Sequence, residues 1–156
     1  MNKVVFDCNV FWQIFFSNTG IGSKCWHLVT LGKIKLVVSK YVLDEIHDVF
    51  TRPETQEKFS QATKTNVDAF IDEIMNLAIF VPTVSNTFEY PRDPKDEPYI
   101  NLAVQEDALY LVSRDKDLLD LMTGYDEKSK EFRQRFRPLK VIDTLEFVSI
   151  MEKEGF

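Results

Sequence analysis

The sequence predicts an α/β domain with a mainly parallel sheet flanked by helices. Short apolar runs alternate along the chain with longer segments in which apolar residues recur at helical spacing. The 156 residues suffice for one domain with a sizeable core. No repeat, low-complexity tract or linker divides them. We therefore expect a single domain over residues 1–156.

Five apolar runs are the predicted strands, and the segments between them are the predicted helices. The strands are Lys3–Phe6, Lys35–Val38, Leu77–Val81, Leu109–Ser113 and Leu139–Ile142. The helices are Val10–Ser17, Ser23–Gly32, Lys40–Phe50, Thr65–Asn76, Pro98–Asp107 and Thr144–Glu152. Gly32 closes the second helix as a C-terminal glycine would. Ser39 suits the N-cap of the third helix, and the pair Arg52-Pro53 ends it.

Acidic side chains stand where apolar runs end. Asp7 directly follows the first predicted strand, with Asn9 two residues on. The fourth strand leads through Ser113 to Asp115 and Asp117. Parallel sheets bind ligands in the crevice outside the carboxyl ends of their strands, so we expect these side chains to converge. Several carboxylates there would repel one another unless a cation sat between them, which predicts a divalent-metal site.

Each acid beside the first and fourth strands also has a structural interpretation as a helix cap. Asn9 suits the N-cap of the first helix, which leaves Asp7 without that task, and we favour Asp7 as a ligand. Asp117 can cap a short helix that begins at Leu118. Ser113 can hydrogen-bond a carboxylate or a metal-bound water.

The helix after the second strand carries three acids, of which one is well placed. Its apolar stripe contains Val42 and Ile46. At 3.6 residues per turn, Asp44 and Asp48 point away from this stripe, whereas Glu45 lies at its margin. Glu45 can therefore lean over the sheet edge or remain a solvated boundary residue, and spacing alone does not decide between these interpretations.

The segment Asp93–Pro98 leads into the fifth predicted helix. Pro98 is tolerated only in the first turn, so the helix begins near Asp96 or Glu97. Asp96 is either an N-cap or a ligand, since a helix N-terminus stabilises an acid in both cases. Asp93 is expected to be a turn residue. Glu97 is an alternative ligand should the register differ by one.

The charge distribution gives weak information about nucleic acids. The net charge of −6 is unlike that of a simple nucleic-acid binder, which carries a basic excess. Residues 124–140, however, contain six Lys or Arg and three acids, a local charge of +3. Arg133, Arg135 and Arg137, interleaved with Phe132 and Phe136, could hold phosphates or stack a base. We favour the alternative, a solvated helix whose phenylalanines pack inward.

Several classes of protein lack support. Cys8 and Cys25 are the only cysteines, so we expect no disulfide framework and a reducing, cytoplasmic environment, with Cys8 a buried apolar residue. No segment resembles a signal peptide or reaches the length of a membrane span. His27 and His47 lack zinc-type spacing. There is no glycine-rich phosphate loop, Cys-x-x-Cys pair or Gly-x-Ser-x-Gly elbow.

The acids in their order resemble the acidic constellation of PIN-domain nucleases. The motifs that carry the resemblance are Asp7-x-Asn9, Gly32–Ser39, the Glu45 helix ending at Arg52-Pro53, Asp93–Asp96 and Val112–Leu119. Together they resemble the branch whose members are described as toxin components of prokaryotic toxin–antitoxin systems. The resemblance extends from Val4 to about Phe147. It implies a Rossmann-like sheet and cleavage of RNA phosphodiester bonds dependent on Mg²⁺ or Mn²⁺.

The resemblance also implies roles for individual residues and partners. The acidic quartet that binds metal and carries catalysis would be Asp7, Glu45, Asp96 and Asp115. Asn9, Ser113 and Asp117 would support it, Asp117 as a further metal ligand. A cognate antitoxin is the expected protein partner, and a homodimer fits. The chain departs from the family in having Glu97 where many relatives have Asp and Ser113 where Thr is frequent. Its segment Met122–Pro138 is also longer than usual.

Two other functions stay open. A PIN-like module that binds RNA or an antitoxin without cutting has no evident need for four uncompensated acids. A phosphatase with an aspartyl nucleophile would match Asp7-Cys8-Asn9 in part. Asn9, however, stands where that enzyme has its general acid, and we expect no well-placed lysine. Metal-dependent unfolding tests the first alternative, and phosphate-monoester hydrolysis that survives Asp115→Asn tests the second.

Overall fold

The computed structural model describes residues 2–17 and 20–155 of the chain. Within these residues, five strands form one parallel sheet in the order β3-β2-β1-β4-β5. The strands are β1 (Lys3–Phe6), β2 (Lys35–Ser39), β3 (Ile79–Val81), β4 (Tyr110–Val112) and β5 (Lys140–Ile142). The predicted α/β class is thus confirmed, and all five predicted strands are present with small shifts at their ends.

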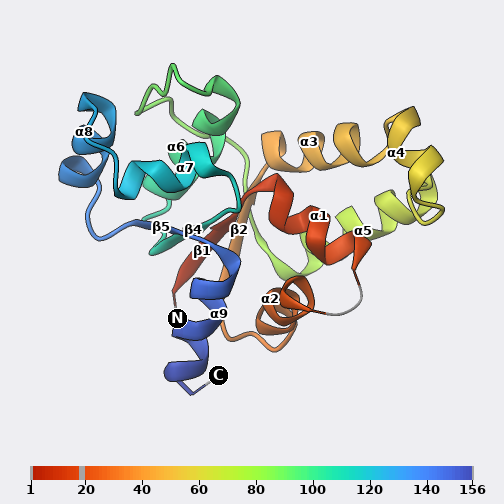
Figure 1. Ribbon diagram of the computed structural model, residues 1–156. Helices are drawn as coiled ribbons and strands as arrows, with labels where there is room; N and C mark the ends of the chain where they lie inside the picture. The colour runs from red at the N-terminus through yellow and green to blue at the C-terminus, as the bar shows by residue number, and fades with distance from the viewer. Residues whose placement is uncertain (1, 18–19, 156) are drawn as a thin grey trace.

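Helices occupy the connections between the strands (Figure 1). The six predicted helices are α1 (Cys8–Phe16), α2 (Ile21–Thr30), α3 (Lys40–Phe50), α5 (Lys64–Leu77), α6 (Glu97–Gln105) and α9 (Thr144–Lys153). Further helical segments are α4 (Pro53–Lys58), α7 (Lys116–Leu119), α8 (Glu127–Arg135) and the 3-10 turns η1 (Pro94–Asp96) and η2 (Asp120–Met122). Pro53 ends α3 as expected, but it also occupies the first position of α4, where its fixed φ suits a helix start.

The central strand β1 is covered by helices from both ends of the chain. The ring of Phe6 contacts Phe11 of α1 and Phe147 of α9. Helix α6 packs against β1, β2 and β4. Figure 1 shows α6, α7 and α8 to one side of the strands and α1, α3, α4 and α5 to the other. Helices thus flank the sheet, as in a Rossmann-like fold.

Aromatic packing fixes helix α3 against its neighbours. Val42, Ile46 and Phe50 are its buried residues, spaced by four as a helix face requires. The ring of Phe50 contacts Trp12 in α1 and Phe70 in α5. Burial of this stripe fixes the rotation of α3 about its axis. Glu45, between these buried positions, is consequently half-buried at the margin of the stripe.

The carboxyl ends of β1 and β4 are held in register at one edge of the sheet. Phe6 of β1 aligns with Val112 of β4. The ladder continues one residue further on both strands. The backbone N–H of Asp7 donates to the carbonyl of Val112 at 2.9 Å, and that of Ser113 donates to Ile142 at 3.0 Å. The residues that follow these strands are therefore anchored by the sheet itself.

No helix in the described part of the chain is long and apolar enough to cross a membrane.

Candidate metal centre

Three carboxylates converge at the carboxyl edge of the sheet. Asp7, Asp96 and Asp115 each offer one oxygen, and the three oxygens lie within 4.8 Å of one another. Asp7 follows β1, Asp115 follows β4, and Asp96 closes η1 immediately before α6. Asp7 and Asp115 meet because they follow parallel strands, as expected from the sequence.

Asp7 caps helix α1, which corrects the expectation that Asn9 does so. The helix begins at Cys8, and Asp7 Oδ1 accepts a hydrogen bond from the Cys8 N–H at 2.7 Å. Asn9 lies inside the helix, where its Oδ1 accepts from the N–H of Arg114 at 3.2 Å. Asn9 therefore links α1 to the segment after β4. Capping uses one oxygen of Asp7, and the second remains available for other contacts.

Ser113 orders two of the three acids with one hydroxyl. The side chain is fully buried, and its O–H donates to Asp7 Oδ2 at 2.7 Å. The same oxygen accepts from the backbone N–H of Asp115 at 2.9 Å. Asn9 Nδ2 lies 3.5 Å from it as well. Ser113 thus contacts Asp7 and Asp115, Asn9 contacts Ser113, and the supporting role expected for both stays a prediction.

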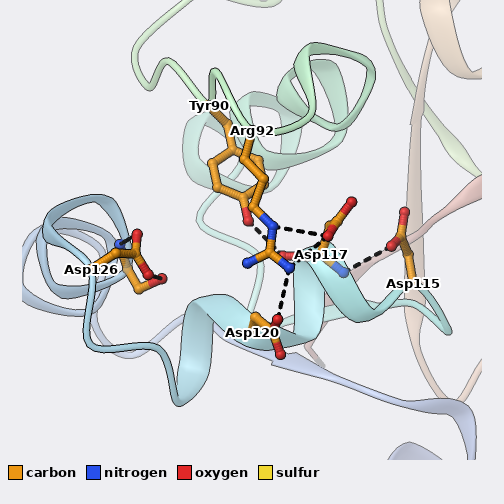
Figure 2. Close-up of polar contacts among 7 residues, drawn as sticks. Tyr90, Arg92, Asp115, Asp117, Asp120 and Asp126 are labelled. Carbon is orange, nitrogen blue, oxygen red and sulfur yellow. Dashed lines mark hydrogen bonds and ion pairs between the residues drawn. The ribbon is translucent and has the colours of Figure 1, made fainter.

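Asp115 is the N-cap of α7, where the sequence suggested Asp117. Helix α7 begins at Lys116 instead of Leu118, and Asp115 Oδ1 accepts from the N–H of Asp117 at 2.9 Å. The carboxylate of Asp117 instead contacts Arg92 (Figure 2). Asp117 also forms a second group of three acids with Asp93 and Asp115, in which each acid offers one oxygen within 4.8 Å of the others. Asp93 is a turn residue as expected, with Oδ1 accepting from the Lys95 N–H at 3.2 Å.

Asp96 is the least satisfied acid of the centre. It is 5% exposed, and its Oδ2 is buried with no hydrogen-bond partner among the described residues. Asp96 occupies the N-cap position of α6, but its side chain makes no capping hydrogen bond, so capping does not account for its buried oxygen. Buried polar atoms are nearly always paired, because an unmade hydrogen bond costs about 1–3 kcal/mol. This oxygen calls for a proton or a cation.

Burial and mutual repulsion favour the protonated forms of Asp7 and Asp96 over their ionised forms. Burial raises the pKa of Asp7 from 3.8 to about 6, opposed by the hydrogen bonds from Ser113 and Cys8 and reinforced by Glu45 and Asp115. Burial also raises the pKa of Asp96 from 3.8 to about 8, and the charges of Asp7 and Asp115 add to the effect. A divalent cation among these oxygens would oppose both shifts, because a nearby positive charge favours the ionised carboxylates.

Glu45 reaches the same pocket but stands apart from the three-oxygen group. Its Oε1 accepts a hydrogen bond from the hydroxyl of Tyr99, and its Oε2 lies 3.5 Å from the hydroxyl of Tyr41. The Glu45 side chain lines the pocket together with the three aspartates at the sheet edge, and the catalytic role expected for it stays a prediction. Sequence reasoning missed both tyrosines. Tyr41 precedes Glu45 by one helical turn, which was a usable signal, whereas the contact with Tyr99 had none.

The acids line a pocket of about 350 Å³. Arg52 and Lys95 add positive charge to its wall, and Trp12 adds an aromatic surface. Cys8 also lines the pocket and is half-buried rather than buried. Burial raises the pKa of its thiol well above the ordinary value, so the nucleophilic thiolate is disfavoured.

Glu97 and three arginines, all named from the sequence, are not among the residues that line this pocket. Glu97 Oε1 accepts from the N–H of Tyr90 at 2.7 Å, and its side chain lines a different pocket, beside β3 and α6. Arg133 donates to the carbonyls of Leu121 and Gly124, both at 2.8 Å. The other two arginines are also engaged within their own segment, Arg135 with Glu131 at 2.7 Å and Arg137 with the Arg133 carbonyl at 3.2 Å.

The segment that holds these arginines contains helix α8, and its phenylalanines pack inward, as in the interpretation that we favoured from the sequence. Phe132 is fully buried and contacts the ring of Phe88, so the aromatic residues of α8 pack inward. The basic residues are then distributed over an exterior helix face. Phosphate contacts by Arg133, Arg135 and Arg137 gain no support from their positions.

Comparison with known proteins gives one family assignment. A family model described as PIN domain matches residues 3–117. The matched stretch begins at β1 and includes Asp7, Glu45, Asp96, Asp115 and Asp117. It ends inside α7, so η2, α8, β5 and α9 follow the matched residues. A search of curated proteins found no match.

Proposed function

The chain belongs to the PIN-domain family, and from this premise we propose that it is a metal-dependent endoribonuclease hydrolysing RNA phosphodiester bonds. PIN domains are generally metal-dependent nucleases that act on nucleic acids. The observation that carries the proposal is the buried, unpartnered Oδ2 of Asp96 beside the carboxylates of Asp7 and Asp115. An acidic group of this kind is costly without a cation and has the oxygen donors that a hard cation prefers.

The ligands of the ion would be Asp7, Asp96 and Asp115. An all-oxygen donor set suits Mg²⁺ or Mn²⁺. When bound, such an ion supplies Lewis acidity toward a water molecule and toward the phosphate. Ser113 keeps Asp7 and Asp115 in place through its two hydrogen bonds. Outer contacts of this type fix the orientation of ligands.

The remaining residues of the pocket have roles toward the substrate. Glu45, at the rim and held by Tyr99, offers a carboxylate that can accept a proton from the attacking water. Arg52 and Lys95 supply positive charge where an RNA phosphate would enter. These charges offset part of the repulsion that a cluster of acids exerts on a polyanion.

An RNA-cleavage assay with purified protein tests the proposal. We expect cleavage of single-stranded RNA with Mg²⁺ or Mn²⁺, loss of cleavage in EDTA and recovery on adding metal back. Asp7→Asn should lower the rate by at least about 100-fold, because the variant keeps the cap but loses a charged ligand. Asp143→Asn is the matched control, since Asp143 also follows a strand and caps a helix, α9.

Equal cleavage by the wild type and Asp7→Asn would end the proposal of a nuclease. RNA binding without cleavage by either protein would instead favour a non-catalytic PIN-like module that binds RNA or an antitoxin. That module would also show no shift of its unfolding midpoint at millimolar Mn²⁺, since a ligand bound only by the native state raises the midpoint.

We further propose that the enzyme acts as the toxin of a cytoplasmic toxin–antitoxin pair and that it assembles as a homodimer. Support comes from the motifs that resemble that branch, from Gly32–Ser39 to Val112–Leu119. An antitoxin could inhibit by inserting a cationic side chain among the carboxylates. Inducible expression tests this role. Wild-type protein should arrest growth, Asp7→Asn should not, and arrest by both proteins would contradict an RNase toxin.

A further inference from the structure

Arg92 bridges two carboxylates beside the metal centre (Figure 2). Its Nε donates to Asp117 Oδ1 at 2.9 Å, and its Nη2 lies 2.6 Å from the same oxygen. Nη2 also donates to Asp120 Oδ2 at 2.8 Å. Asp117 lies in α7 and Asp120 in η2, so one planar guanidinium holds both segments. Charge-assisted contacts of this forked kind combine strength with fixed geometry.

The second group of acidic oxygens thus already has an internal cation. Asp93, Asp115 and Asp117 place one oxygen each within 4.8 Å of one another, and Asp115 belongs to both groups. In the second group, Arg92 pairs with Asp117. In the first group, Asp7, Asp96 and Asp115 form no ion pair with any of the described residues. The two groups have similar geometry and differ in their charge compensation.

Tyr90 fastens the same segment to α7 independently of the guanidinium. Its hydroxyl donates to the backbone carbonyl of Asp117 at 2.6 Å, and the ring is 1% exposed. Figure 2 shows the Tyr90 and Arg92 side chains reaching α7 from one stretch of chain. This second anchor restricts how far Arg92 can move from Asp117. The guanidinium is thus a built-in part of the site.

From this geometry we propose that Arg92 takes the second cation position, so that each chain binds one divalent ion, at Asp7, Asp96 and Asp115. The inference rests on the proposed function. A second ion at Asp93, Asp115 and Asp117 would lie against a guanidinium of like charge. Arg92 and Asp117 are partly exposed to solvent, and two like charges this close repel one another even at a protein surface. Asp117 Oδ1 also already accepts both contacts from Arg92. Arg92 is a positioning residue, and Asp117 is its partner instead of a metal ligand.

Counting bound Mn²⁺ tests the assignment without measuring activity. The free ion is measured by electron paramagnetic resonance during titration of each protein with MnCl₂. We expect one ion per chain for the wild type and two for Arg92→Gln, which removes the charge. Adding Asp117→Asn to Arg92→Gln should return the count to one, because a ligand of the second group is then lost.

Two variants separate charge compensation from a merely structural role. Arg92→Lys keeps the positive charge, and Tyr90→Phe removes the hydroxyl contact with α7 while leaving Arg92 in place. Both should bind one ion. Two ions on Tyr90→Phe would show that loosening α7 is sufficient to open the second group, which would overturn the role of the Arg92 charge.

The outcomes for this inference and for the proposed function differ. Two ions on the wild type, or one ion on a folded Arg92→Gln with unchanged affinity, would overturn the assignment of Arg92 alone. Absence of Mn²⁺ from the wild type together with one ion on Arg92→Gln would support Arg92 as the internal cation and end the metal-dependent function. Absence of Mn²⁺ from both proteins would overturn both.

Discussion

At the scale of single residues, the centre depends on hydroxyl groups that hold carboxylates. The Ser113 hydroxyl donates to the carboxylate of Asp7 at 2.7 Å and accepts from the backbone N–H of Asp115 at 2.9 Å, and the Tyr99 hydroxyl donates to the carboxylate of Glu45. A carboxylate that both caps a helix and accepts a buried hydroxyl has little rotational freedom. The Asp7 carboxylate is therefore oriented before any ion arrives, which lowers the cost of binding one.

Ser113→Ala should lower RNA cleavage and Mn²⁺ affinity by roughly 10–100-fold, the usual effect of losing an outer contact to a ligand. Ser113→Thr keeps the hydroxyl and should restore most of both. Metal titration and initial cleavage rates for the two variants measure the effect. Wild-type rates and affinity in Ser113→Ala would mean that the hydroxyl has no part in arranging the acids.

At the scale of elements, the segment from η2 through α8 forms a packed cover beside α6 and α7. Helix α8 packs against η2, and Phe132 contacts both Phe88 and Phe136. Arg133 closes the turn before α8 through the carbonyls of Leu121 and Gly124. The long segment Met122–Pro138 thus has a structural task, even though its charge suggested contact with RNA.

Phe132→Ala should lower the free energy of unfolding by about 3–5 kcal/mol, because a fully buried aromatic side chain is lost. Arg135→Gln removes an exposed ion pair and should leave the free energy of unfolding nearly unchanged. Urea unfolding measures both. RNA binding should be the same for Arg135→Gln as for the wild type. A clear loss of RNA affinity would support the phosphate contact, the interpretation that the sequence favoured less.

At the scale of the whole molecule, burial of acids couples folding to protons and metal. Asp7 and Asp96 have an ordinary pKa of 3.8 and, when folded, values of about 6 and about 8. The folded state thus binds protons more tightly than the unfolded state. The resulting stability is fully present below about pH 3.8 and is lost as the pH rises through about 6 and then about 8.

The metal-free protein should therefore melt at a lower temperature at pH 8 than at pH 5, by on the order of 5 °C. Saturating Mn²⁺ should raise the melting midpoint at pH 8. At a free Mn²⁺ concentration of 100 times the dissociation constant, the gain in the free energy of unfolding is roughly 2.7 kcal/mol. Calorimetry in EDTA and in MnCl₂ measures both effects. Asp96→Asn should flatten the pH dependence. A midpoint that rises from pH 5 to pH 8 would contradict the coupling.

Much of the fold was predictable because its signals are local in the sequence. The apolar runs Lys3–Phe6 and Lys35–Val38 predicted strands, and the stripe around Ile46 set the rotation of α3. Helix α4 was missed because Pro53 signals both the end of one helix and the start of another. The convergence of Asp7 and Asp115 followed from parallel strands alone.

The sequence by itself determined that the chain is an α/β domain with acids at the carboxyl edge of its sheet. Only the tertiary structure decided how each acid is satisfied. The unpartnered Oδ2 of Asp96, the Tyr99 contact of Glu45 and the Arg92 contact of Asp117 all join segments distant along the chain. The physical reason is that periodicity and capping act over one or two helical turns. The partner and the burial of a side chain depend instead on which segments the folded core brings together.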